Sequence, residues 1–555
     1  MSLVAVVQEG LMTFHADLII ACADVLTLDE ASNRAEAIAV RNGQILAVGS
    51  QSEIERLAGP ATERIDARGQ TVIPGLIDTH AHVEAAGILN YTISFEGVRN
   101  VAEAQARVAD MAARTPPGEW LRGRIWHPLS QLAERRFLTR DELDEAAADH
   151  PVVLPTSHFT MTNSRALALA GISARTDDPP GGTIHRKQGS HEPMGVLEES
   201  AEDLVNAVVP EWSSDIQIEQ MKEAMAYFNR FGITSAISAC VSPKDMRILD
   251  TIRREGRSTL RLGIMFAPTG GLNPTLSRDE WEAFLSRMGV ASGFGDEWLQ
   301  FCALKMQVDG GMTLRTALMR DPYPGDETYR GTVVVAEDRL RDFVLVANRY
   351  GWRVGAHAVG DAAIDMLLDA YEAADREKSI GDRRFIIIHG SLIQEDQMRR
   401  AHAMGVRVDA QSVFLWDKAE AIARNLGRET TARAVPLRTM IDIMGIDNVA
   451  QGTDYPINGL DPFVNMHVMV TRQDVNGTVF GPEQAVTVEE ALRLYTSAAA
   501  RYAFAEDRVG TIEPGKLADF AFLSANPLAI DPASLRSIRV LRTMVGGQMV
   551  FSEQM

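Results

Sequence analysis

The sequence predicts an α/β fold: a (β/α)8 TIM-like barrel, a small β-sandwich domain formed by both chain ends, and a large insertion after barrel strand 1. Three observations indicate this architecture. Strand-like and helical stretches alternate through the middle of the chain. The two ends contain strand-like runs joined by turn signals, and about 150 residues interrupt the alternation after the first middle strand.

Eight candidate barrel strands can be read in the middle of the chain. They are residues 71–78, 232–239, 258–266, 299–306, 352–357, 384–389, 405–410 and 447–453. Between most of them lie stretches with helical apolar spacing, such as residues 218–231, 337–351 and 362–375. Eight strands with intervening helices fit a closed barrel. A doubly wound open sheet is the alternative, but no G-x-G-x-x-G motif follows any of these strands.

Both ends of the chain are rich in strand signals. Asn42-Gly43, between two apolar runs, predicts a hairpin near the start, and Gly546-Gly547 marks a similar turn near the end. The predicted domains are a β-sandwich, residues 1–73 plus 506–555, and a barrel, residues 74–505, with residues 85–215 as an insertion over the barrel mouth. Because loops at this face carry specificity, we expect the insertion to shape the substrate pocket.

Composition restricts the partners and the compartment. The formal net charge is −20 at pH 7, and such a surface repels phosphate backbones, so we expect no nucleic-acid partner. Cys22, Cys240 and Cys302 stand far apart, which favours a reducing compartment over a disulfide framework. No apolar run reaches the roughly 18 residues that a membrane span needs, and the N-terminus lacks the basic region of a signal peptide. We therefore expect a cytoplasmic protein without a membrane partner.

Ionisable residues gather at the predicted C-terminal ends of the barrel strands, where barrel enzymes place their functional groups. They are His80 and His82 after the first strand, Lys305 in the fourth, His357 in the fifth, His389 in the sixth and Asp454 after the eighth. The second, third and seventh strands end in small or uncharged residues. Each residue alone has a structural explanation, as a core histidine or a capping aspartate. Together they predict a metal centre, since two histidines two apart on a strand point the same way.

Lys305 lies in the middle of the apolar stretch "FCALKMQVDGG", residues 301–311. A lysine almost never goes fully inside a protein unless something pairs with it. Its position in a buried strand therefore indicates a role at the strand end, and burial would lower the pKa of its amine.

Six motifs carry a resemblance to a known family. "VIPGLIDTHAH" and "VGTIEPGKLADFAFLSANP" resemble the first-strand signature of the amidohydrolase superfamily and its return to the small β domain. That superfamily consists of metal-dependent hydrolases on a (β/α)8 barrel. Within it, "WLRGRIW", "HFTMTNSRALALAGI", "LKMQVDGGMTLRTA" and "HAVGDAAID" are similar to the branch that includes N-substituted formamide deformylases. The resemblance covers almost the whole chain.

The resemblance implies a role for each matching residue. His80, His82 and Asp454 would bind a first divalent metal ion, and His357 and His389 a second, with Zn²⁺ the ion that suits mixed N and O ligands. Lys305 would bridge the two ions as N6-carboxylysine, since its neutral amine can attack CO2 and the carbamate offers two oxygens. The site could hold one ion if Lys305 stays unmodified. Metal-activated hydroxide would attack the substrate, with Asp454 as proton shuttle and therefore the catalytic residue.

The predicted function is hydrolysis of a C–N bond in a small amide-like molecule, an amide or an N-substituted formamide. A lactone, carbamate or cyclic amide would use the same metal site. A non-catalytic regulatory barrel is the alternative of another class, and the presence of all six ligand positions opposes it. The family precedent favours a homodimer.

Four further residues are predicted to contact the substrate: His158, Asn163, Trp126 and Asp309. Each also has a structural explanation. His158 and Asn163 match an H-x-x-x-x-N stretch of the branch and also fit a turn with a helix cap, Trp126 fits a core, and Asp309 fits a turn after the strand. The branch often has an aromatic residue where Met161 stands and an acidic one where His127 stands. Both differences would alter the pocket, so the substrate need not be the one typical of the branch.

Overall fold

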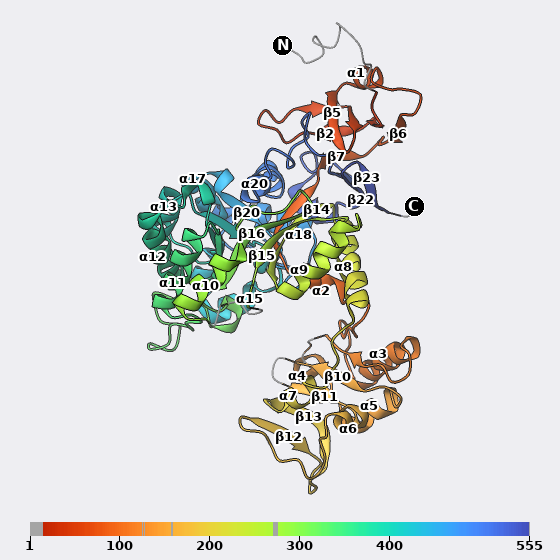
Figure 1. The fold of residues 1–555 in the computed structure, drawn as a ribbon, viewed down its shortest axis with the longest axis vertical. Helices are drawn as coiled ribbons and strands as arrows, with labels where there is room; N and C mark the ends of the chain where they lie inside the picture. Colours follow the sequence, from red (N-terminus) through yellow and green to blue (C-terminus); the bar gives the residue numbers. More distant parts are fainter. Residues whose placement is uncertain are drawn as a thin grey trace. The chain divides into compact units, whose positions relative to one another are not determined.

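The computed structural model describes residues 15–124, 126, 128–156, 159–269, 273 and 276–553. The chain divides into two compact units (Figure 1). The first contains the residues up to 86 together with those from 221 onwards, and the second contains residues 87–220. Within the described ranges, no helix is both long enough and apolar enough to cross a membrane.

Eight parallel strands form the centre of the first unit. They are β8 (Leu76–Ala81), β14 (Ile233–Val241), β15 (Arg261–Phe266), β16 (Leu299–Gln307), β17 (Val354–Ala358), β18 (Ile386–His389), β19 (Arg407–Ala410) and β20 (Val449–Gln451). Their order in the sheet follows the chain, and the Asp454 N–H just after β20 donates to the His80 carbonyl of β8 at 2.7 Å. This contact joins the last strand to the first. The predicted (β/α)8 barrel is therefore confirmed, and the doubly wound alternative is wrong.

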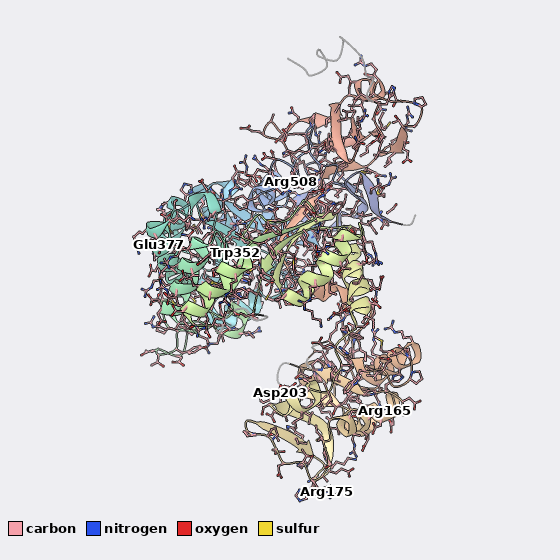
Figure 2. The ribbon with its side chains drawn as sticks, in the orientation of Figure 1. Arg165, Arg175, Asp203, Trp352, Glu377 and Arg508 are labelled. Atoms are coloured by element: carbon pink, nitrogen blue, oxygen red, sulfur yellow. The ribbon has the colours of Figure 1, made fainter. Side chains whose placement is uncertain are left out.

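Amphipathic helices lie outside the barrel strands (Figure 1). They include α9 (Pro243–Arg254), α10 (Arg278–Met288), α11 (Glu337–Arg349), α12 (Asp361–Glu377), α13 (Glu395–Ala403) and α17 (Leu437–Met444). In α12 the buried Ile364, Leu367, Leu368 and Tyr371 recur at helical spacing and form one apolar stripe. Trp352, labelled in Figure 2, is fully buried just before β17. The helices thus bury the outer faces of strands that are apolar on both sides.

The stretch predicted as the first barrel strand, residues 71–78, is two strands in two different sheets. β7 (Thr71–Pro74) ends before Gly75, and β8 begins after it. The Gly75 N–H donates to the Asp519 carbonyl at 2.9 Å, and a Cβ at Gly75 would lie 2.1 Å from the Thr234 hydroxyl oxygen. Only glycine fits where the chain passes from one sheet into the other.

Strands from both chain ends build a six-stranded sheet, in the order β23-β22-β21-β7-β2-β3. Its members besides β7 are β2 (Asp24–Leu26), β3 (Arg34–Ala35), β21 (Phe520–Leu523), β22 (Val540–Val545) and β23 (Gln548–Ser552). A four-stranded sheet has the order β5-β4-β1-β6, from β1 (Leu18–Ala21), β4 (Ala37–Arg41), β5 (Gln44–Gly49) and β6 (Glu63–Asp66). The two sheets share one apolar core, to which Ile20, Val72 and Phe520 belong.

The hairpin predicted at Asn42-Gly43 joins β4 to β5. Both turn residues have positive φ, 49° and 73°, as a tight turn between twisted strands requires.

A buried ion pair connects the six-stranded sheet to the barrel. The Arg261 guanidinium of β15 donates to both oxygens of Asp519, the residue before β21, at 2.7 and 3.0 Å.

The second unit has its own sheet and core. Five strands have the order β12-β13-β11-β10-β9, from β9 (Leu121–Arg122), β10 (Val152–Pro155), β11 (Phe159–Thr162), β12 (Gly182–Arg186) and β13 (Pro193–Glu199). Helices α3 (Val101–Arg114) and α5 (Arg140–Ala146) begin at side-chain caps on Asn100 and Thr139. The position of this unit over the barrel mouth stays a prediction.

Candidate metal centre

The six predicted metal ligands come together at the C-terminal ends of the barrel strands. All six line one cavity of about 510 Å3: His80, His82, Lys305, His357, His389 and Asp454. The ring centres of His80 and His389 lie 5.2 Å apart, and those of His357 and His389 lie 4.5 Å apart. Residues from β8, β16, β17 and β18 and from the turns after β8 and β20, distant in the sequence, thus form one cluster of nitrogen and oxygen donors.

His80, His82 and Asp454 have the geometry of a metal site. One donor atom from each lies within 4.8 Å of the others. The Nε2 atoms of both imidazoles face the Asp454 Oδ1 at 3.6 Å. Their Nδ1 atoms lie near other carboxylates, 3.3 Å from Asp409 Oδ2 for His80 and 3.7 Å from Glu84 Oε1 for His82. Two nitrogen donors and a carboxylate this close together fit a divalent ion such as Zn²⁺.

The hydrogen bonds of His357 and His389 assign their tautomers. The His357 Nε2 lies 3.0 Å from the Gly310 carbonyl oxygen, which can only accept, so Nε2 carries the proton and Nδ1 keeps its lone pair. The His389 Nδ1 lies 2.6 Å from the Gln411 carboxamide oxygen, so here Nδ1 carries the proton and Nε2 keeps the lone pair. Each ring therefore offers one free nitrogen.

Burial keeps these imidazoles neutral, which is the form that binds metals. It lowers the pKa of His357 to about 4, with the charge of Lys305 as a second cause. Burial likewise lowers the pKa values of His80 and His389 well below their usual value. Desolvation of the imidazolium form is the dominant cause in all three.

Lys305 is 5% exposed, although it carries an ammonium in its ordinary form. Burial lowers its pKa to about 8, while the nearby carboxylates of Asp454 and Asp409 act in the opposite direction. A substantial fraction of the amine is then neutral near physiological pH. Burial thus brings the pKa of the amine beside the histidine cluster closer to neutral pH than that of an ordinary lysine.

Two residues of the cluster have backbones in the left-handed region. His389 has φ 71° and Asp454 has φ 56°, a conformation that costs a non-glycine residue about 1–3 kcal/mol. Such strain persists only where the surroundings enforce it, and it concentrates at functional sites.

The seventh strand contributes polar groups that the sequence analysis missed. Strand β19 was predicted to end without ionisable residues, yet Asp409 and Gln411 are buried and reach His80 and His389. The spacing of two could have revealed them, since it places both side chains on one face of the strand. Glu84, which faces His82 and accepts from the Ser238 hydroxyl at 2.9 Å, was also missed.

Asp309 was predicted as a substrate contact, but its carboxylate is fully buried. It accepts the N–H groups of Leu318, Val359 and Gly360 at 2.8 to 2.9 Å. These bonds hold the loop that follows His357, whose Nε2 lies 3.7 Å from the Asp309 Oδ1. Asp309 therefore stabilises the loop next to the donor cluster. The structure shows this role for its carboxylate and not the predicted contact with substrate.

Two of the other predicted substrate contacts, Asn163 and Trp126, lie in the second unit. Asn163 is fully buried and caps helix α6 (Ser164–Leu169), because its side chain accepts the Ala166 N–H at 3.0 Å. Trp126 is 5% exposed in the apolar core of this unit and stacks on Phe95 at 4.0 Å between ring centres. For these two residues the structure shows the capping and core positions. His158 lies outside the described residues.

Apolar side chains form much of the remaining cavity wall. They are Met312, Leu314, Val334, Val359, Phe414 and Ile457. Leu314 and Ile457 are exposed, by 75% and 55%, although they border the cavity. A cleft of this size, with convergent polar groups and apolar walls, fits a small organic ligand.

A closed parallel barrel with these donors at its strand ends defines a class of metal-binding barrel enzymes. The chain belongs to the amidohydrolase family, whose model matches residues 63–551. The predicted resemblance is thereby confirmed.

Individual relatives agree with this membership. The chain is 30% identical over 556 residues to the N-substituted formamide deformylase of Arthrobacter pascens, covering 97% of this chain and 98% of the relative. It is 29% identical over 540 residues to the putative amidohydrolase YtcJ of Bacillus subtilis, covering 95% and 98%. Among solved structures, an uncharacterised metal-dependent hydrolase from Pyrococcus furiosus matches with a TM-score of 0.74 and 27% identity, over 92% of this chain and 99% of that one.

Proposed function

We propose that the protein is a metal-dependent hydrolase that cleaves the C–N bond of an amide or an N-substituted formamide. The observation that carries the proposal is the convergence of four histidines, one lysine and one aspartate on a single cavity at the barrel mouth. A non-catalytic barrel has no need to keep all six groups together. The full-length similarity to the Arthrobacter deformylase supports the substrate class.

The residues divide into two donor sets. His80, His82 and Asp454 would hold a first divalent ion, and His357 Nδ1 and His389 Nε2 a second. Lys305, as N6-carboxylysine, would contribute to both. A divalent ion held here supplies a Lewis acid that lowers the pKa of water and polarises a carbonyl.

Asp454 is the residue that moves the proton. Burial raises the pKa of its carboxyl to about 6, close to the pH at which the enzyme would work. Its Oδ1 faces the two imidazoles of His80 and His82, which leaves Oδ2 to take a proton from the attacking water. The same oxygen then returns the proton to the leaving nitrogen, so that the amine departs as a neutral molecule.

The cavity walls position the rest of the substrate. Met312, Val334 and Phe414 offer apolar surface beside the donor cluster. Such walls favour a small molecule with an apolar substituent, which leaves water as it enters.

The three cysteines are all free, which supports a cytoplasmic location for the enzyme.

The test combines a metal assay with a substrate panel. We expect about one or two equivalents of Zn²⁺ per chain, as in the mononuclear and binuclear hydrolases. A chelator should remove both metal and activity, and added Zn²⁺ should restore both. Amides, formamides, lactones, cyclic amides and carbamates should be compared at one concentration. Turnover of lactones alone would refute the assignment of a C–N bond as the one cleaved. A native protein free of metal would refute the proposal that it is a metal-dependent enzyme.

A further inference from the structure

Two buried side chains, one in the seventh barrel strand and one in the turn after it, contact the proposed ligands. Asp409 lies in β19 and Gln411 follows two residues later, so both project to the barrel interior. Asp409 is fully buried, and Gln411 is 1% exposed. Neither lines the cavity with the six proposed ligands. Both contact ligands on the side away from the cavity.

Gln411 contacts one proposed ligand directly. Its carboxamide oxygen accepts from His389 Nδ1 at 2.6 Å. Its amide nitrogen donates to the Asp409 backbone carbonyl at 3.1 Å and lies 3.3 Å from Asp409 Oδ1. These two acceptors orient the carboxamide so that its oxygen faces the imidazole.

Asp409 contacts a ligand on the opposite side of the cluster. Its Oδ2 lies 3.3 Å from His80 Nδ1, a buried atom that makes no hydrogen bond among the described residues, so this carboxylate is the acceptor placed next to it. The Thr79 hydroxyl donates to Oδ1 at 2.7 Å, and the hydroxyl of Tyr502, at the end of α20 (Ser497–Tyr502), donates to Oδ2 at 3.1 Å. These donors offset part of the cost of burying the carboxylate and hold it in place.

We propose that Asp409 and Gln411 are positioning residues that assign the tautomers of His80 and His389 and thereby link the two donor sets. The inference rests on the proposed metal centre. Asp409 holds the proton of His80 on Nδ1 and turns Nε2 towards Asp454. Gln411 does the same for His389, and Asp409 in turn fixes Gln411. The Asp409 carboxylate therefore positions one imidazole in each donor set. It acts on His80 directly and on His389 through the Gln411 carboxamide.

This arrangement predicts an asymmetry between the two residues. Loss of the Asp409 charge should weaken metal binding in both donor sets, because the carboxylate lies beside His80 Nδ1 and also accepts from the Gln411 amide, which keeps only the backbone carbonyl in the variant. Loss of the Gln411 carboxamide should weaken only the set that contains His389. Outer-sphere partners of histidine ligands typically change metal affinity by about 10–100-fold.

The experiment measures Zn²⁺ affinity directly, without substrate. Metal-free protein is titrated with Zn²⁺ in competition with a chromophoric chelator, for wild type, Asp409→Asn, Gln411→Met and Tyr502→Phe. We expect Asp409→Asn to lower the affinity for every bound Zn²⁺ ion by about 10–100-fold. Gln411→Met should lower the affinity for one ion and leave the affinity for the other unchanged. Tyr502→Phe removes the longer of the two hydroxyl bonds to the same carboxylate without touching an imidazole. Because the shorter bond from Thr79 still holds the carboxylate, this variant should bind Zn²⁺ as the wild type does.

The outcomes separate this inference from the proposed function. A wild type that takes up no Zn²⁺ overturns the metal centre, and the inference with it. A wild type that binds Zn²⁺ while both variants bind it equally well overturns the inference alone. Equal losses in Asp409→Asn, Gln411→Met and Tyr502→Phe would show a general packing role and also overturn it. If Asp409→Asn fails to fold, as judged by circular dichroism, the ion-selective loss in Gln411→Met decides.

Discussion

The barrel mouth and the second unit use their buried polar side chains in opposite ways. At the mouth, His80, Lys305 and Asp454 are buried close together, and burial shifts the pKa of each towards its neutral form. In the second unit, the buried Asn163 uses its carboxamide on the backbone of its own neighbourhood. It accepts the N–H groups of Val152 and Ala166 and donates to the carbonyls of Ala147 and His150.

This difference teaches how to separate a functional polar residue from a structural one. A polar group whose hydrogen bonds go to nearby backbone stabilises the fold that it belongs to. A cluster of ionisable groups that are buried together costs free energy, and it persists where an activity requires it. Substitutions should therefore affect catalysis without stability at the barrel mouth, and stability without catalysis in the second unit.

The largest expected effect is that of Asp454→Asn. The amide has the same shape but cannot take up the proton, so kcat should fall by about 10²- to 10⁴-fold while the fold is retained. Steady-state kinetics and circular dichroism measure the two properties. Asp461→Asn is the matched control, since Asp461 caps α18 (Pro462–Thr471) and asparagine caps equally well. A kcat near that of the wild type in Asp454→Asn would refute the proton shuttle.

Lys305→Ala should have the next largest effect, on metal content. Without the lysine no carbamate can form, and the affinity of the metal centre should fall by at least the factor of about 10–100 that loss of an outer-sphere partner causes. Short carboxylic acids such as acetate could occupy the space left by the side chain, so they should restore part of the activity. In Lys305→Met that space is filled, and the same acids should have no effect. Unchanged metal content in both variants would show that Lys305 is no ligand.

Asn163→Ala tests the other side of the comparison. It removes a helix cap and leaves buried backbone groups without partners, so the second unit should lose about 1–3 kcal/mol of stability. Because its side chain is fully used within this unit, kcat and KM should stay unchanged below the unfolding temperature. Arg165→Ala, at an exposed position of the same helix, should alter neither property. A raised KM with normal thermal unfolding would instead establish the substrate contact that the sequence predicted.

The barrel could be predicted from the sequence because its strands are continuous apolar runs between amphipathic helices. The run at residues 299–306 is almost identical to the observed β16, Leu299–Gln307. Residues 71–78 were misread as one strand, because apolar character does not tell which sheet a residue joins. The contact of Gly75 with Asp519, far along the chain, separates β7 from β8, and no local pattern encodes it.

The ligand cluster could be predicted since parallel strands bring their C-terminal ends to one face. The roles of Asp409 and Gln411 could not, because these depend on which side chains the two residues face across the barrel. Asp309 shows the opposite error. Its position next to Gly310 indicated a site residue or a turn, and only the structure shows its carboxylate accepting three backbone N–H groups near His357.

The smallest expected effect is on KM and concerns the apolar wall of the cavity. Here a substitution should change substrate binding and leave stability unchanged. Leu314 borders the cavity but is 75% exposed, so Leu314→Ser should leave thermal unfolding unchanged. If its side chain covers the substrate, removing it should raise KM a few-fold, at about 25 cal/mol for each Å2 of apolar surface that the complex no longer buries. The increase should grow with the size of the apolar substituent on the substrate nitrogen and vanish for unsubstituted formamide. Val475→Ser, at a position that is 51% exposed and outside the residues that line the cavity, is the control for a general surface effect. Equal changes in KM for both variants would show that Leu314 does not contact the substrate.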